Sequence, residues 1–373
     1  MRSVSGRLQS AWITALLAAF GPCACSTLGS EGLGDIGLPS AGVGPFRRLA
    51  SDEVPGIAPF VLDGEGGYRE PAVLSEDANA PKVVMYAGAT GAGRDGVPVG
   101  PVIVRSFAND GRSFVGTGGG PGRGTTLVLA ASEPWEGGQV GSPFALRVGT
   151  EVFLFYAGAG GIGLSRASSV EGPFVKQKAP ILDAFGQGPW ESGPPRAPTA
   201  YLEGRTLHLF YSSGAAIGEA VADLDALAFR RVDADPSTPS FDPVLWPSPT
   251  VDPTTLALGE KPPFDEAAVT DPSVSVRTTP AGRTHIRVLY TGVATKGTTA
   301  IGFAARYGHE GRLARQVVPI YAAKGKERAP ALLDLGNVGY LYFTEPRTSD
   351  ARDGIGGAYS PAGGDPGPLV PIE

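Results

Sequence analysis

The segments LFYAG (residues 154–158) and LFYSS (209–213) are nearly identical, and they decide the fold. Each is an apolar run of β-prone residues that ends on an aromatic residue followed by small ones. Three related segments occur elsewhere in the chain: MYAG (85–88), LYTG (289–292) and LYFTE (341–345). Self-similarity of this kind is typical of a repeat architecture, in which each copy is one supersecondary unit.

Three further features recur around these segments. An X-Pro pair precedes each one, and the prolines lie 55 to 74 residues apart: Glu70-Pro71, Ser142-Pro143, Ala197-Pro198, Asp271-Pro272 and Ala329-Pro330. An Ile-Gly step follows in four copies, with Val102 in its place in the first: Ile162-Gly163, Ile217-Gly218, Ile301-Gly302 and Ile355-Gly356. A phenylalanine then opens a fourth strand in three copies: Phe114, Phe174 and Phe229. Five copies of a four-stranded antiparallel unit predict a five-bladed β-propeller, because radial stacking lets each blade cover its neighbours' apolar faces.

The composition agrees with this fold class. Glycine and proline account for 55 and 35 of the 373 residues, which is typical of many short strands and turns. Helix bundles and coiled coils do not tolerate helix-breaking residues at that density. Disorder is disfavoured as well, since 42% of the residues are hydrophobic and only 18% are charged. The sequence therefore predicts an all-β protein.

A segment that precedes the first copy predicts how the ring is closed. The last copy ends soon after Ile355, whereas GPFRRL (44–49) precedes the first blade and is similar to the outer strands GPFVK (172–176) and FRRV (229–232). We expect residues 44–50 to supply the outer strand of the fifth blade, which removes an exposed sheet edge.

The N-terminus has the features of an export signal. Arg2 and Arg7 precede an apolar run at 11–20, which is too short to span a bilayer. Cys25, with Ala24 before it, resembles the end of a bacterial lipobox, which implies lipidation at Cys25; simple secretion after signal-peptidase cleavage is the alternative. We expect a signal peptide at 1–25, a Gly/Ser-rich tether at 26–43 and the propeller at 44–373. The protein would then be anchored by lipid in the bacterial cell envelope, on the outer membrane or the periplasmic face.

Charge and metal-ligand patterns exclude some partners. The formal net charge of −6 and the short Lys/Arg clusters argue against nucleic acid. The three histidines have no metal-ligand spacing and both cysteines lie in the leader, so the sequence predicts neither a metal site nor a cofactor. We expect a monomer.

The motifs PILD (180–183), WESG (190–193) and LFYS (209–212), together with the X-Pro pairs, resemble those of a known superfamily. It is the five-bladed propeller glycosidases: arabinanases, β-xylosidases, levansucrases and invertases, in glycosyl hydrolase families such as 43 and 32. The resemblance covers about residues 45–373 and implies a carbohydrate ligand. It also implies acids just before the blade prolines, an Asp, an Asp and a Glu on the first three blades. This chain has Glu70, Ser142 and Ala197 there, so only the first position is acidic.

Glu70 and Asp271 are the two acidic residues at the five X-Pro positions. They belong to blades one and four, two steps apart in a ring of five. Hydrolysis of a glycosidic bond needs two carboxyl groups across it, so one hypothesis makes Asp271 the base and Glu70 the acid. The alternative is that both are channel-mouth carboxylates held by arginines such as Arg69, or by turn amides. The propeller would then bind carbohydrate or protein without turnover.

Other candidate ligands for a sugar repeat between blades. Two matching Pro-Trp-Glu loops offer an indole to stack on a sugar ring and a carboxylate to bind its hydroxyls: Trp135-Glu136 and Trp190-Glu191. A structural role is the alternative for these loops. Three arginines stand two residues before a blade proline and suit an anionic ligand such as a uronic acid: Arg69, Arg196 and Arg328. The alternative is that they pair with Glu70, Glu191 and Glu327.

Overall fold

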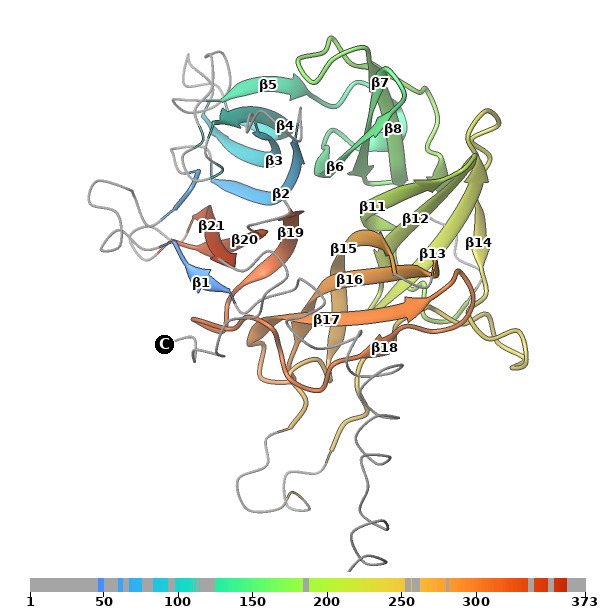
Figure 1. Ribbon diagram of the computed structural model, residues 1–373. Coiled ribbons are helices and arrows are strands. Elements are labelled where there is room, and N and C mark those ends of the chain that lie inside the picture. The colour runs from blue at the N-terminus through green and yellow to red at the C-terminus, as the bar shows by residue number, and fades with distance from the viewer. Residues whose placement is uncertain are drawn as a thin grey trace, which may run out of the picture.

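The computed structural model describes residues 46–49, 60–62, 67–75, 83–92, 98–109, 111, 114, 125–183, 188–251, 256, 262–279, 282–334, 339–347 and 352–360. Five antiparallel sheets surround a central axis as a five-bladed β-propeller (Figure 1). The predicted all-β fold is confirmed, and in these ranges the only helical element is the 3-10 turn η2 (Pro134–Glu136). None of the described helices is long and apolar enough to cross a membrane. The predicted signal peptide, Cys25 and the tether lie outside the described residues.

The blades follow one another in chain order, and in each the first strand listed here lies innermost. Blade I contains β2 (Tyr68–Ser75), β3 (Val83–Ala92), β4 (Pro98–Ala108) and β5 (Thr126–Leu129). Blade II contains β6 (Gly141–Val148), β7 (Glu151–Gly158), β8 (Gly161–Ala167) and β9 (Val175–Lys176), and β10 (Leu182–Asp183) also pairs with β8. Blade III contains β11 (Arg196–Glu203), β12 (Thr206–Ser213), β13 (Ala216–Asp223) and β14 (Arg230–Val232). Blade IV contains β15 (Ala268–Thr278), β16 (Thr284–Val293), β17 (Thr299–Tyr307) and β18 (Ala314–Arg315). Blade V contains β19 (Arg328–Asp334), β20 (Gly339–Pro346), β21 (Asp353–Ser360) and β1 (Arg47–Arg48).

The predicted ring closure is confirmed. The N-terminal strand β1 is the outer strand of blade V, where Arg47 pairs with Tyr359 and Arg48 with Ala358 (Figure 1). Phe46 is fully buried beside this pairing. The first described segment of the chain therefore completes the last blade, so that blade V is built from both ends of the propeller.

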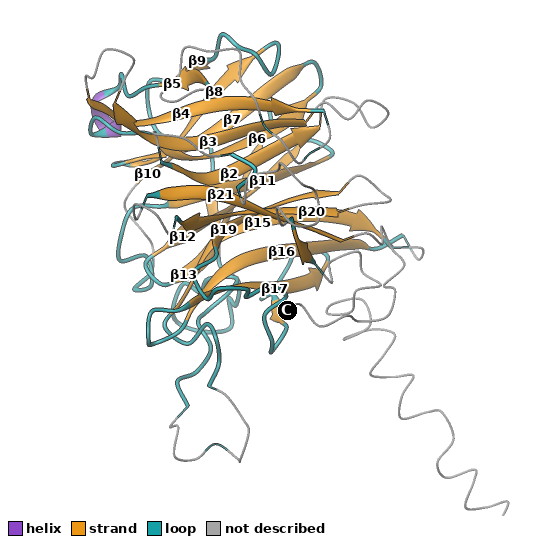
Figure 2. Cartoon of the chain, turned by 90° about the vertical axis from the view of Figure 1, so that its left-hand side faces the viewer, coloured by secondary structure: helices purple, strands orange, loops and turns teal. Residues whose placement is uncertain are grey.

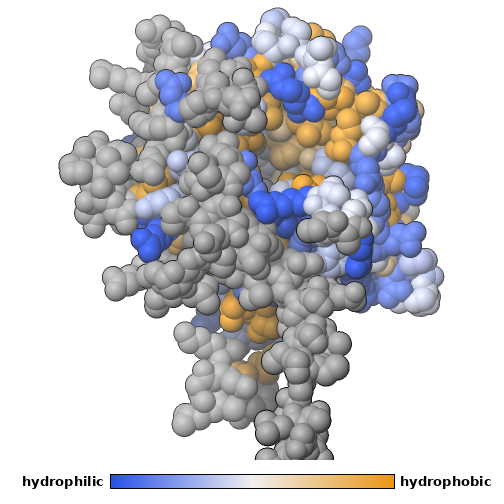
Figure 3. All heavy atoms as spheres, in the orientation of Figure 1, coloured by the Kyte–Doolittle hydropathy of each residue, from blue (hydrophilic) through white to orange (hydrophobic). Residues whose placement is uncertain are grey.

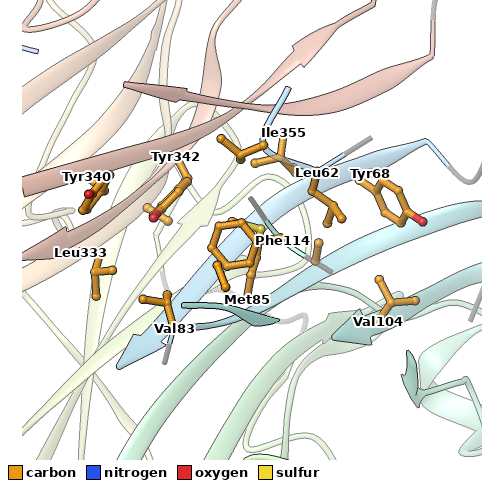
Figure 4. Packing of buried hydrophobic residues seen from close by; sticks show 14 of the residues in the cluster. Leu62, Tyr68, Val83, Met85, Val104, Phe114, Leu333, Tyr340, Tyr342 and Ile355 are labelled. Carbon is orange, nitrogen blue, oxygen red and sulfur yellow. The ribbon is translucent and has the colours of Figure 1, made fainter. Parts of the chain in front are cut away.

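Five buried clusters hold the ring together, and each combines residues of two neighbouring blades. In the cluster between blades V and I, Tyr342 and Ile355 of blade V pack with Met85 and Val104 of blade I and with Phe114 (Figure 4). Seen from the side, the blades lie as twisted sheets beside one another (Figure 2). A blade cannot bury both faces alone, so most of the apolar strand residues become core only once the ring forms.

The Ile-Gly steps have a packing reason. In each of the four copies the glycine lies against the second-strand aromatic ring, so that an added Cβ would stand 2.3 to 2.6 Å from Tyr156, Tyr211, Tyr290 or Phe343. In three of these blades, the isoleucine bridges back to the segment that leads into the next blade, at Leu182, Leu245 and Tyr321. In blade V, Ile355 bridges Leu62, ahead of blade I. These recurring apolar segments therefore fasten each blade to the next.

Blade I departs from two sequence predictions. Tyr86 pairs with Arg105 where the other blades pair their aromatic with glycine, so Val104, not Val102, holds the isoleucine position. The outer strand β5 begins at Thr126 and not at Phe114, whose ring packs edge-on against Tyr342 at 5.6 Å. Blade I has an insertion and a large side chain where the other copies have glycine, and a repeat pattern cannot align such a copy correctly.

Candidate functional site

The five X-Pro pairs meet at the central channel. All five line one cavity of about 60 Å³, to which every blade contributes one pair. Each X residue has a left-handed backbone, with φ of 55° at Glu70, 45° at Ser142, 49° at Ala197, 51° at Asp271 and 50° at Ala329. The pairing between the two innermost strands shifts register at each of these positions. Non-glycine residues rarely adopt this conformation, least of all before proline, and such strain concentrates at functional sites.

Hydroxyl groups of the preceding blade hold three of these strained residues in place. The backbone N–H of Glu70 donates to Thr344 Oγ1 at 2.7 Å. In the same way, the N–H of Asp271 donates to Ser212 Oγ at 2.7 Å, and the N–H of Ala329 donates to Thr291 Oγ1 at 2.8 Å. Ser212, Thr291 and Thr344 all stand just after the second-strand aromatic. The small residue that recurs at this place therefore positions the next blade's X-Pro turn.

Blade II uses a different acceptor. The residue after the aromatic in blade I is Ala87, which has no hydroxyl. Instead the backbone N–H of Ser142 donates to Glu70 Oε2 at 2.7 Å. Glu70 therefore does for blade II what a serine or threonine hydroxyl does for blades I, IV and V.

The two channel carboxylates each lie near an arginine. Arg69 Nε is 4.0 Å from Glu70 Oε2, and Arg196 Nη1 is 3.8 Å from Asp271 Oδ1. Thr270 also donates its hydroxyl to Asp271 Oδ2 at 3.0 Å. The structure thus brings both acidic X-Pro residues to the channel cavity. The Ser142 backbone amide binds Glu70 and the Thr270 hydroxyl binds Asp271, whereas Arg69 and Arg196 lie near these carboxylates without a hydrogen bond, so the geometry favours the turn-amide alternative for Glu70.

The predicted arginine pairs are only partly present. Arg196 belongs to blade III but pairs with Asp271 of blade IV, and not with Glu191. Arg328 forms an ion pair with Asp353 at 2.7 Å, and not with Glu327, whose carboxylate accepts the backbone N–H groups of Lys324 and Lys326. The sequence spacing identifies the arginines but not their partners, because the partner in one case lies on the next blade and in the other on the third strand.

A second cavity opens beside the channel over blades I to III. It has a volume of about 240 Å³ and is lined by Arg69, Glu70, Gln139, Ser142 and Arg196 among others. Glu70 and Ser142 line both this cavity and the channel. We call the second cavity the arginine cleft. On the face seen in Figure 3, hydrophobic residues (orange) gather in a hollow near the middle of the ring, with hydrophilic residues (blue) around it.

The two Trp-Glu pairs do not line these cavities, although Trp135 and Glu136 pack behind Gly158 and Ala159 of the arginine cleft. Trp135 stacks on Tyr156 and Trp190 on Tyr211, with ring centroids 5.8 and 6.1 Å apart. Trp190 also donates its indole N–H to the carbonyl of Phe241 at 2.9 Å. Neither tryptophan and neither glutamate is among the residues that line the channel cavity or the arginine cleft.

The glutamates of these pairs are buried within hydrogen-bond networks. Glu136 accepts bonds from Tyr156 Oη at 2.8 Å, Lys176 Nζ at 2.6 Å and the backbone N–H groups of Ser132 and Glu133. Glu191 accepts from Tyr211 Oη at 2.6 Å and Arg231 Nε at 3.0 Å. Burial, and then the carboxylate of Glu191, raise the pKa of Tyr211. The geometry therefore favours the structural alternative for both loops.

The same arrangement recurs in other blades and was missed in the sequence. In blade IV, Phe264 stacks on Tyr290, and Asp265 accepts bonds from Tyr290 Oη at 2.8 Å and Arg315 Nη1 at 2.9 Å. Blade V shares only the ion pair: Arg48 of the outer strand binds the buried Glu345, which lies on β20 itself. The cation in each case is at the outer strand: Lys176, Arg231, Arg315 and Arg48. In each of these blades the basic residue stands two positions after a phenylalanine or leucine at the outer strand, and this recurring spacing could have revealed the buried ion pairs in the sequence.

Candidate metal ligands lie elsewhere in the described part of the chain. Glu203, His208 and His309 have ligand atoms within 4.8 Å of one another. Glu203 and His208 occupy the end of the β11–β12 pair that is opposite Arg196 and Ser212. The cluster is therefore separate from the channel mouth.

Comparison with known proteins identifies the fold. No protein-family model matches the chain, and no curated protein matches it in sequence. Among solved structures, it is similar to a thermostable family-43 glycoside hydrolase, at 16% identity and a TM-score of 0.51, over 80% of this chain and 89% of that one. It is also similar to the catalytic domain of the Coprinopsis cinerea GH62 α-L-arabinofuranosidase, at 11% identity and a TM-score of 0.52, over 85% and 95% of the two chains.

A third similar structure is a family 117 glycoside hydrolase of the marine bacterium Zobellia galactanivorans, at 14% identity and a TM-score of 0.53, over 84% and 89% of the two chains. Each similarity spans most of both chains at low sequence identity. The chain therefore has the five-bladed β-propeller fold of these glycoside hydrolases.

Proposed function

We propose that the protein binds an anionic carbohydrate, such as an oligosaccharide of a uronic acid, in the arginine cleft. The observation that carries this proposal is that Arg69 and Arg196, from different blades, line one cleft. Their side chains are 31% and 49% exposed, and their contacts with Glu70 and Asp271, at 4.0 and 3.8 Å, are longer than a hydrogen bond. Both guanidinium groups therefore keep donors for a ligand, and guanidinium matches a carboxylate in a bidentate way. The shared fold with glycoside hydrolases supports carbohydrate as the ligand class.

The same residues favour binding without hydrolysis. A glycosidase places an acid and a base or nucleophile on opposite sides of the bond that breaks. Here Ser142 and Ala197 occupy two of the X-Pro positions that are acidic in the family the sequence resembles. Glu70 Oε2 is engaged by the backbone N–H of Ser142, where other blades use a hydroxyl. Glu70 is thus a positioning residue for blade II.

Hydrolysis by Asp271 and Glu70 is a second candidate function, since both carboxylates line the same channel cavity. Its test is the release of reducing sugar from arabinan, xylan, fructan, mannan and polygalacturonate. We expect no release. Release that disappears in both Glu70→Gln and Asp271→Asn would establish hydrolysis and replace the binding proposal.

The binding proposal is tested with the arginines themselves. Replacement of Arg69 or Arg196 by glutamine should weaken binding of an oligogalacturonate about tenfold or more, because a hydrogen bond to a charged group contributes about 1.5–3 kcal/mol. Isothermal titration calorimetry measures the effect. Arg328→Gln is the matched control: it occupies the same position in blade V, pairs with Asp353 and does not line the cleft. Equal affinity for a neutral oligosaccharide, or an equal loss in Arg328→Gln, would refute the proposal.

We also propose that the protein is exported and anchored by lipid at Cys25. The support is the leader, in which a short apolar run is followed by Ala24-Cys25. Cys25→Ser should move the protein from the membrane fraction to the soluble fraction of the cell envelope, and it should abolish labelling by a fatty-acid analogue. Cys23→Ser is the control and should change neither. Unchanged fractionation of Cys25→Ser would show that the protein is secreted or held in another way.

A further inference from the structure

Two of the three histidines of the chain meet at the boundary of blades III and IV. His208 is buried on β12, and His309 lies in the turn between β17 and β18; their ring centroids are 4.9 Å apart. Glu203, at the end of β11, places Oε2 2.5 Å from His309 Nε2. The ligand atoms of the three side chains all lie within 4.8 Å of one another. This cluster combines two residues of blade III with one of blade IV.

The other nitrogen of each imidazole already has a partner. His208 Nδ1 lies 3.0 Å from the buried carboxylate of Glu219, and Arg306 holds that carboxylate from its other oxygen at 2.5 Å. His309 Nδ1 lies 3.0 Å from Tyr201 Oη. Histidines that bind metals almost always use their second nitrogen in this way, because the outer bond fixes the ring and its tautomer. Since Nδ1 is engaged in both rings, Nε2 is the atom that would bind the metal, and in His309 this atom lies against Glu203 Oε2, the third proposed ligand atom.

The ring of His208 is further fixed by stacking. Tyr201 lies parallel to it, with centroids 4.6 Å apart and planes inclined by 3°. Glu203 also accepts a hydrogen bond from Thr284 Oγ1 of blade IV at 3.1 Å, so its carboxylate is directed toward the blade boundary. The buried ligand is thus rigid, whereas Glu203 and His309 are partly exposed and lie next to turns at Gly204 and Gly308.

We propose that Glu203, His208 and His309 bind one zinc ion, which fastens blade III to blade IV on the side away from the arginine cleft. Two imidazoles and one carboxylate are a common zinc ligand set that leaves a fourth position for water. Bonds of about 2.0–2.1 Å in a tetrahedral arrangement separate neighbouring ligand atoms by about 3.4 Å. Here the ligand atoms of Glu203 and His309 are 2.5 Å apart and all three lie within 4.8 Å, so shifts of about 1–1.5 Å would bring them to that spacing. Imidazole ligands select zinc over magnesium.

The test uses the full chain without a histidine tag and with Cys23 and Cys25 both replaced by serine, so that no thiol competes. After removal of metal with a chelator, zinc chloride should bind with one ion per chain in calorimetry, and it should raise the thermal unfolding midpoint. Magnesium chloride should do neither. Binding of zinc to the native state only would stabilise the fold by mass action.

Three variants make the test specific. His309→Ala should lose zinc binding and the zinc-dependent rise in the midpoint, while its midpoint without metal falls modestly because the contacts with Tyr201 and Glu203 are lost. Glu219→Gln should weaken zinc binding roughly 10- to 100-fold, as loss of an outer-sphere partner does. His285→Gln is the control: His285 is the third histidine, stacks on Tyr307 within blade IV, and should leave zinc binding unchanged. Failure of the parent to bind zinc, equal stabilisation by magnesium, or unchanged binding in His309→Ala would overturn the proposal.

Discussion

Replacement of Phe46 by alanine should lower the free energy of unfolding by about 3–5 kcal/mol, the usual cost of removing a buried phenylalanine side chain. Phe46 is 0% exposed although it belongs to an N-terminal segment that precedes a two-residue strand. It packs in the cluster between blades IV and V with Phe303, Leu341 and Phe343. The loss should be large because this segment closes the ring, so the cavity affects two blades at once.

Chemical denaturation of the two proteins measures the difference. Val317→Ala is the control, since Val317 is 84% exposed, and we expect that substitution to stay within about 0.5 kcal/mol of the wild type. An equally small effect of Phe46→Ala would mean that β1 does not contribute to the closed ring. Deletion of residues 44–50 should lower the free energy of unfolding further, because it also removes Arg48, the ion-pair partner of the buried Glu345.

Replacement of Glu136 by alanine should also cost about 3–5 kcal/mol, the usual effect of breaking a buried ion pair by removing one partner. Glu136 is fully buried and accepts bonds from Lys176, Tyr156 and two backbone N–H groups. Its removal leaves the Lys176 ammonium, which is largely buried, without its carboxylate. Glu151→Ala, an exposed glutamate of the same blade, is the matched control and should be nearly neutral. A small loss at Glu136 would show that the network does not hold the Trp135 loop.

The same carboxylate makes stability depend on pH in one direction. Burial acts to raise the pKa of Glu136, but the bonds from Lys176, the two backbone N–H groups and Tyr156 outweigh burial and hold the pKa below its usual value of 4.5. A carboxyl with a lowered pKa in the folded state adds stability that is fully present above its unfolded pKa and is lost as the pH falls through the folded pKa. Below about pH 4.5 the wild type should therefore lose stability more steeply than Glu136→Gln does. Parallel curves of unfolding free energy against pH for the two proteins would contradict this.

The sequence predicts the architecture because the architecture is periodic. The X-Pro pairs, the LFYAG-type strands and the Ile-Gly steps each have one local physical cause that repeats in most blades: the strained channel turn, the apolar second strand, and the glycine against an aromatic ring. Even the closing strand follows from the similarity of GPFRRL to the outer strands. The prediction is wrong at Val102 and Phe114, where blade I carries Arg105 in place of glycine and an insertion before β5.

The contacts of the site could not be predicted in the same way, because they cross between blades. Arg196 meets Asp271 from the next blade, and Ser142 meets Glu70 from the preceding one. His208 and His309 are about a hundred residues apart in sequence and come together only through the packing of blade III on blade IV. Spacing along the chain does not show which side chains face each other across a blade boundary, and the residues of both proposed sites lie at such boundaries.

A crystal structure of the protein with a bound oligogalacturonate tests the proposed function most directly. We predict an intact sugar in the arginine cleft, with one carboxylate of the ligand within hydrogen-bond distance of Arg69 and Arg196 and with the bond from Ser142 N–H to Glu70 retained. A sugar bound away from these arginines would contradict the proposal. So would a cleaved sugar with Asp271 and Glu70 on opposite sides of the broken bond.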